Sequence, residues 1–186
     1  WINPNYDRAV YIGIGHDTTA CTDPNFTILM RDAILWAAST ESDKPMHSPE
    51  FKALVLTERG SQHEGFVVAA LEWLNKLAAG ENFEIRVINH ANEINERMLA
   101  EYKVVIQLDY PPYNWNDTAI AAFVKYIDEG KGGWVGFHHA TLLGEFDGYP
   151  MWNWFSDFMG GIRFENYIAA TASGKVNVED IKHPVM

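Results

Sequence analysis

The chain has 186 residues, of which 47% are hydrophobic, 13% aromatic and 21% charged. This composition predicts one compact globular domain and excludes a disordered or collagen-like chain. The net charge of −11 would repel a phosphate backbone or an anionic lipid surface, so we expect neither nucleic acid nor a membrane as a partner. No apolar stretch approaches the roughly 20 residues that a membrane span needs. The single cysteine, Cys21, excludes an intramolecular disulfide.

Five short apolar runs alternate with helical patterns along the chain. The runs are Ala9–Gly15, Lys52–Leu56, Phe83–Asn89, Lys103–Asp109 and Gly133–His138. Each run is rich in Val, Ile or Leu and too short for a core helix, as expected of strands buried on both faces by crossover helices. The pattern therefore predicts an α/β fold with a mostly parallel sheet.

The helices are predicted from apolar residues that recur at helical spacing and from their end signals. Asp23 caps the first helix, with Pro24 at its first position, and Asn116 caps a later one that Gly130 ends. Two further helices are expected over Gly65–Ala79, with Gly80 as its stop, and over Trp152–Met159. The polar segment Glu41–Glu50 is typical of a linker, and Tyr167–Val178 has a strand-like pattern.

Ligands of open parallel sheets bind outside the carboxyl ends of the strands, where the strand order reverses. Four of the five predicted strands are followed there by histidine, at His16, His63, His90 and His138-His139. Carboxylates stand at the same ends, namely Asp17, Glu58 and Asp109, and Tyr110 follows the fourth strand. Because imidazole serves both in proton transfer and as a metal ligand, the pattern predicts a pocket for acid–base chemistry or, alternatively, a divalent metal such as zinc.

Each of these residues also has a purely structural interpretation. His90 follows an expected edge strand and is typical of a solvated loop. His138 and His139 are adjacent, and neighbours in an extended chain point to opposite faces, so we expect only one of them to enter the pocket. The aromatic cluster around Trp152 fits either a sugar-stacking platform or core packing of a short helix, and the second interpretation is favoured.

Several motifs resemble those of ThuA-like domains, a family named for trehalose utilisation that shares the architecture of class I glutamine amidotransferases. The matching stretches are KALVLTERGSQHE from Lys52, EYKVVIQLD from Glu101, GGWVGFHHA from Gly132, WNWFSDFMGGIRF from Trp152 and IKHPV from Ile181. This resemblance implies a three-layer α/β/α sandwich with a flavodoxin-like sheet.

The opening segment is similar to the end of the same family's domain, so the order of the segments is inverted. The matching residues lie within YDRAVYIGIGHDTTACTDPNFTILMRDAILWAA, from Tyr6. The domain is thus expected to span residues 1–186, with 1–40 as the family's last strand and helix, 41–50 as the linker and 51–186 as its first two thirds. A circular permutation, a window across tandem domains and a reordering of segments all fit this order. An acidic segment of the family has no counterpart here.

The resemblance places His138 where the amidotransferases present their nucleophilic cysteine. It therefore implies no thiolate nucleophile and no glutamine hydrolysis, and it implies instead an action on carbohydrate of the trehalose-like or keto-sugar class. Under this hypothesis His138 is the central acid–base residue or metal ligand, His63 and His16 are its partners in either role, and Glu58 or Asp17 orients them. Tyr110, Asp109, His139 and Trp152 are the candidates for substrate binding. The alternative, which the missing acidic segment favours, is a noncatalytic carbohydrate-binding or interaction module.

Overall fold

The computed structural model describes residues 6, 8–14, 18–39, 51–58, 63–145, 148–166 and 181–185. Five parallel strands form one sheet in the order β1-β5-β4-β2-β3. The strands are β1 (Ala9–Ile12), β2 (Lys52–Leu56), β3 (Glu84–Ile88), β4 (Val104–Gln107) and β5 (Gly133–Phe137). All five predicted strands are confirmed, and those other than β2 are shorter than the apolar runs that predicted them. The expected linker and the strand-like segment Tyr167–Val178 lie outside the described residues.

The strand order reverses between β2 and β4. From β2 the chain adds β3 on one side, and then β4 and β5 on the other, while β1 pairs with the far edge of β5. Counted from Lys52 with β1 taken last, this order is the 2-1-3-4-5 of flavodoxin-like sheets. The opening strand therefore occupies the place that the last strand of such a sheet would take.

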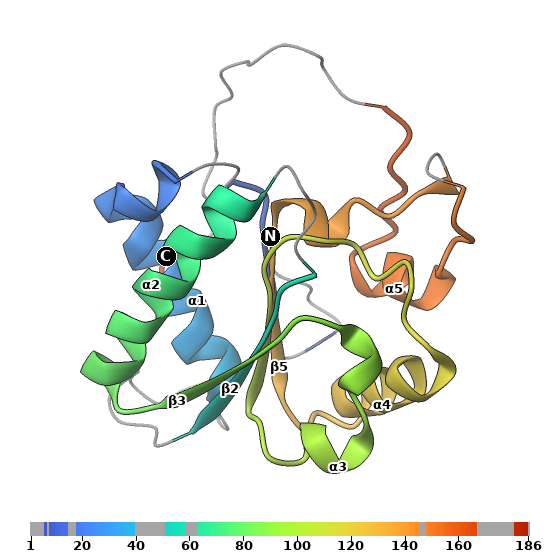
Figure 1. Cartoon of the computed structure of the whole chain (residues 1–186), viewed down its shortest axis with the longest axis horizontal. Helices are drawn as coiled ribbons and strands as arrows, with labels where there is room; N and C mark the ends of the chain where they lie inside the picture. Colours follow the sequence, from blue (N-terminus) through green and yellow to red (C-terminus); the bar gives the residue numbers. More distant parts are fainter. Residues whose placement is uncertain are drawn as a thin grey trace.

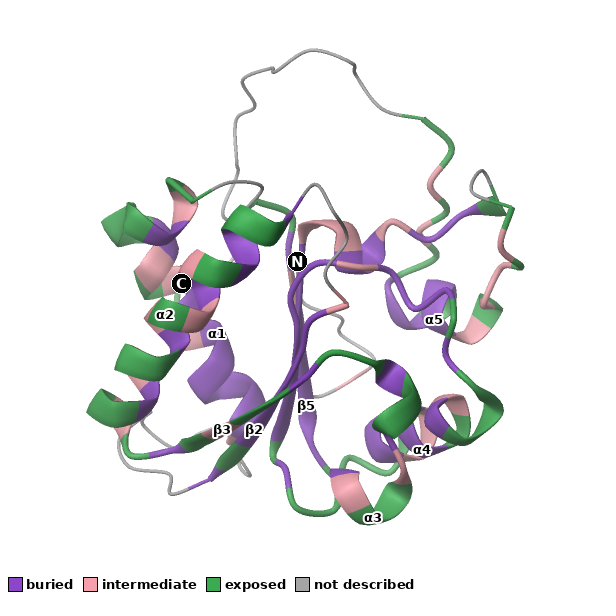
Figure 2. Ribbon diagram, in the orientation of Figure 1, coloured by how far each residue is buried: buried purple, intermediate pink, exposed green. Residues whose placement is uncertain are grey.

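Two layers of helices cover the sheet (Figure 1). Helices α1 (Pro24–Ala38) and α2 (Glu64–Glu81) lie on one face, and α3 (Glu96–Leu99), α4 (Asp117–Asp128) and α5 (Asn153–Phe158) lie on the other. Side chains that alternate along each strand supply the two cores: Ala53 and Val55 belong to the core beneath α1 and α2, whereas Leu54 and Leu56 face the opposite layer. Figure 2 shows the buried central strands between the layers and exposed residues along β3, the edge strand.

The helix ends follow the sequence signals at three of four positions, Asp23, Asn116 and Gly130, the last of which follows the end of α4 with a φ of 62°. The Asp23 carboxylate accepts hydrogen bonds from the backbone amides of Asn25 and Phe26, and the Asn116 side chain accepts one from Ala119. The stop predicted at Gly80 is wrong, because α2 continues to Glu81 and ends at Asn82, whose φ is 55°. Asparagine tolerates this left-handed conformation better than most residues, so it can end a helix as glycine does.

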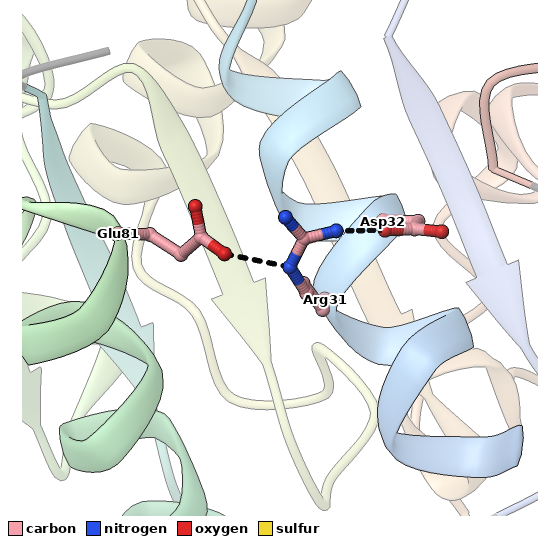
Figure 3. Close-up of polar contacts among 3 residues, drawn as sticks. All are labelled: Arg31, Asp32 and Glu81. Atoms are coloured by element: carbon pink, nitrogen blue, oxygen red, sulfur yellow. Dashed lines mark hydrogen bonds and ion pairs between the residues drawn. The ribbon is translucent and has the colours of Figure 1, made fainter. Parts of the chain in front are cut away.

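Helix α1 is tied closely to the rest of the molecule. The Arg31 guanidinium donates from Nε to Glu81 of α2 at 2.7 Å and from a terminal nitrogen to Asp32 at 2.7 Å, as Figure 3 shows. On the sheet side, a Cβ added at Gly133 would lie 2.0 Å from the backbone oxygen of Ala37, so the helix backbone rests directly on β5. None of the helices in the described residues has the length and apolar character that crossing a membrane requires.

Candidate functional site

Three histidines from two distant parts of the chain meet at the carboxyl edge of the sheet. His63 precedes α2, whereas His138 and His139 directly follow β5 in the short 3-10 helix η3 (His138–Thr141). A ligand nitrogen of each lies within 4.8 Å of the other two. The ring centroids are 5.5 Å apart for His63 and His138, 4.2 Å for His63 and His139, and 4.0 Å for the stacked pair His138 and His139.

Both members of the His138-His139 pair enter this cluster, so the expectation that only one would do so is wrong. The rule of opposite faces applies to extended backbone, and the chain leaves the extended conformation directly after Phe137. His138 has a φ of 43°, in the left-handed region, and begins η3. The sharp change of direction brings the two rings together instead of separating them.

The backbone at this turn is held by hydrogen bonds from two elements. The His138 carbonyl accepts from the Thr141 hydroxyl at 3.2 Å and from the Tyr11 hydroxyl of β1 at 3.4 Å. Left-handed backbone is unfavourable for residues other than glycine, although histidine adopts it more often than most. The contact from Tyr11 makes β1, which comes from the opening segment of the chain, a direct support of the histidine turn.

Two carboxylates lie at the ends of the neighbouring strands β2 and β4. Asp109 is 2% exposed, and its Oδ1 accepts a hydrogen bond of 3.0 Å from the backbone amide of Glu58. Burial, with a smaller contribution from the Asp109 charge, raises the pKa of Glu58 to about 7, although contacts with the Ala91 backbone and the Trp115 side chain lower it. Glu58 therefore changes its charge near neutral pH, which suits a group that gives and takes protons.

The other predicted site residues lie outside the histidine cluster or outside the described residues. Tyr110 is half-buried, its carbonyl accepts a hydrogen bond from Gln107 at 2.7 Å, and its ring meets the edge of Tyr113. Trp152 packs against Trp115 and against further aromatic residues of the core, namely Phe123, Trp154 and Phe155, as the favoured interpretation expected. His90 is exposed at the end of β3, and His16 and Asp17 lie outside the described residues.

Sequence reasoning did not identify Trp115 as a neighbour of Glu58. Trp115 follows β4 in the segment PPYNWN, and its side chain influences the pKa of Glu58. Its place after a strand end was the available signal, but an aromatic residue before a helix cap is equally typical of core packing. Trp115 lies beside Glu58 at the carboxyl edge and also packs against Phe123 and Trp152 of the aromatic core.

The parallel sheet, its 2-1-3-4-5 order and the two helical layers define a flavodoxin-like α/β sandwich. The family model ThuA, described as trehalose utilisation, matches residues 52–186, so the chain belongs to the ThuA family. The matched stretch contains Glu58, His63, His138 and His139.

Among solved structures, the chain is similar to a ThuA-like protein from Bacteroides uniformis ATCC 8492. The two share 30% sequence identity with a TM-score of 0.55, over 69% of this chain and 50% of the other. A peptidase from an acI-B1 actinobacterium shares 12% identity with a TM-score of 0.46, over 73% of this chain and 55% of the other. The chain thus spans about half the length of these proteins. No curated protein matches the sequence.

Proposed function

We propose that this protein acts on a carbohydrate of the trehalose-like or keto-sugar class through acid–base chemistry at the carboxyl edge of its sheet. The convergence of His63, His138 and His139 carries the proposal, because three imidazoles from two distant segments meet at the edge where parallel sheets bind ligands. The family's description as trehalose utilisation supports a substrate of the trehalose-like class.

The residues divide into proton-transfer groups and groups that orient the site. His138 is the central residue of the site, as acid–base group or as metal ligand, since it stands at the sharp turn after β5 with His63 and His139 beside it. Glu58 is a second proton-transfer group, whose environment raises its pKa to about 7. Asp109 orients the Glu58 backbone, and Tyr110 contributes to the wall of the site. His16 and Asp17 follow β1 in the sequence and are included as further candidates.

A thiolate mechanism is not part of the proposal. Cys21, the one cysteine of the chain, is buried in the 3-10 helix η1 (Ala20–Thr22), and the turn after β5 presents His138 instead. In α/β folds that form an acyl-enzyme from such a strand-to-helix turn, the turn carries the nucleophile.

The test is turnover of trehalose and of its keto derivatives, followed by chromatography of the reaction mixture. The wild-type chain is compared with His138→Asn, which removes the imidazole but tolerates the left-handed backbone, and with His90→Asn at the exposed end of β3. We expect turnover to fall by a factor of about 100 or more in His138→Asn and to stay unchanged in His90→Asn. Equal rates in the two variants would contradict the role of His138. Binding of these sugars without turnover in the wild type would instead show a carbohydrate-binding module.

A further inference from the structure

The three-histidine cluster has the composition and the spacing of a transition-metal site. Its members are His63, His138 and His139, and one nitrogen of each lies within 4.8 Å of the others. Neutral imidazole is the commonest protein ligand for zinc and related metals. We infer that these three side chains bind one divalent metal ion of the zinc class. The inference rests on the proposed function only for the part that the ion would take in turnover.

The distances allow a single ion to reach all three rings. Tetrahedral zinc bonds nitrogen at about 2.0–2.1 Å, which places two ligand nitrogens about 3.4 Å apart. The ligand nitrogens lie within 4.8 Å of one another, so a pair needs to approach by at most about 1.4 Å for one ion to bind both. The rings of His138 and His139 are stacked, with an interplanar angle of 17°, and must tilt apart to direct both nitrogens to one ion.

The positions of the ligands are set by rigid elements. His63 immediately precedes an α-helix of 18 residues, and it is 4% exposed. His138 and His139 follow β5, a fully buried strand that pairs with β1 on one side and β4 on the other. Such support matters because metal sites need their ligands held close to the bonding geometry before the ion arrives.

The ligand set also selects the kind of ion. Magnesium and calcium prefer oxygen ligands, whereas imidazole favours zinc, copper, iron or nickel. Three protein ligands are typical of catalytic zinc sites, which keep one position for water or substrate. An ion at this cluster would polarise a substrate carbonyl or activate a water molecule.

The direct test is metal binding in the absence of sugar. The chain is stripped with a chelator, and zinc is titrated by calorimetry, while cobalt(II) is titrated by visible absorption, which reports tetrahedral coordination. We expect one ion per chain. The variants His63→Gln, His138→Asn and His139→Gln should each weaken zinc binding more than about 100-fold, above the 10–100-fold loss typical of outer-shell changes. His90→Gln is the matched control, because His90 is exposed at the end of another strand, and its zinc affinity should equal that of the wild type.

Absence of zinc binding by the wild type would overturn the inference, and so would wild-type zinc affinity in all three cluster variants. Circular dichroism establishes that each variant folds. If the buried His63 variant fails to fold, the half-buried His138 and His139 variants still decide the question. Zinc binding without sugar turnover would support the inference and contradict the proposed function. Sugar turnover by a protein that binds no zinc would support the proposed function and contradict the inference.

Discussion

Glu58 has a pKa well above that of an ordinary glutamate because of its place in the fold. It lies two residues beyond β2, partly buried, with the carboxylate of Asp109 bonded to its own backbone amide. Burial disfavours the charged carboxylate, and the negative charge of Asp109 adds to this effect, so the pKa rises from 4.5 to about 7. The folded protein therefore holds a proton on Glu58 at pH values where the unfolded chain has lost it.

This difference predicts that stability falls as the pH rises. Between pH 4.5 and about 7 the folded state binds one proton more than the unfolded state, so the stabilising effect of the protonated carboxyl is complete below 4.5 and is lost as the pH rises through about 7. Glutamine cannot ionise. The free energy of unfolding of Glu58→Gln should therefore increase by about 1–3 kcal/mol, relative to that of the wild type, between pH 4.5 and 8. Urea unfolding of both proteins at these two pH values measures the change. If the free energy of unfolding changed equally with pH in the wild type and in Glu58→Gln, the pKa of Glu58 would be that of an ordinary glutamate.

The left-handed turn at His138 leads to a second prediction at this scale. A non-glycine residue in this conformation costs about 1–2 kcal/mol, which glycine does not pay. His138→Gly should therefore be more stable than His138→Ala by about 1 kcal/mol, since the φ of 43° is easy only for glycine. Thermal and urea unfolding of the two variants test this difference. An alanine variant as stable as the glycine variant would show that the backbone at residue 138 relaxes to negative φ.

Single residues were also where sequence reasoning was weakest. The presence of histidine at the strand ends was predictable, because apolar runs mark the strands and parallel strands end at one edge. The pairing of His138 with His139 was not, because it depends on a backbone angle that Tyr11 and Thr141 support through their hydrogen bonds. The burial of Glu58 beside Trp115 likewise depends on tertiary contacts.

Among the secondary-structure elements, α1 and β5 approach each other closely. At Gly133 the helix backbone of Ala37 takes the space that a side chain would need, with only 2.0 Å between its oxygen and an added Cβ. Glycine is thus required at the start of β5 for reasons of packing, although it is an unfavourable residue in a strand. The family-like sequence GGWVGF contains this residue, but only the packed structure shows what it accommodates.

Gly133→Ala should destabilise the protein by about 2–3 kcal/mol or more, because α1 must move away from the sheet. Gly80→Ala is the matched control: Gly80 is exposed within α2, and an added Cβ meets no atom within 4 Å. Alanine is the better helix former, so Gly80→Ala should stabilise the protein by about 0.5–1 kcal/mol. Urea unfolding of both variants measures these opposite changes. An unchanged free energy of unfolding in Gly133→Ala would contradict the close approach of α1 to β5.

At the scale of the whole molecule, the opening segment supplies the strand beside β5 and a helix of one covering layer. Strand positions and the parallel sheet were predictable from alternating apolar runs and helical patterns. The placement of residues 9–38 was expected only from the resemblance to the family's final strand and helix, since local patterns do not encode which strands pair. In the structure β1 pairs with β5, and α1 shares one core with α2. The ThuA family model matches residues 52–186, and the opening segment adds a strand and a helix to that part.

A chain of residues 51–186 should therefore fail to fold cooperatively. It would expose the edge of β5 and the sheet face that α1 covers, including Val55, Val135 and Phe137, each of which is fully buried in the whole chain. Exposed apolar surface beside an unpaired strand edge favours aggregation and a loosely packed state. We expect the shortened chain to bind the dye ANS and to lose the sharp urea transition of the whole chain. Adding residues 6–39 as a separate peptide should restore that transition, because the peptide supplies β1, α1 and the Tyr11 contact to His138. A shortened chain with an unchanged transition would show that the opening segment is an accessory to a sheet that is already stable.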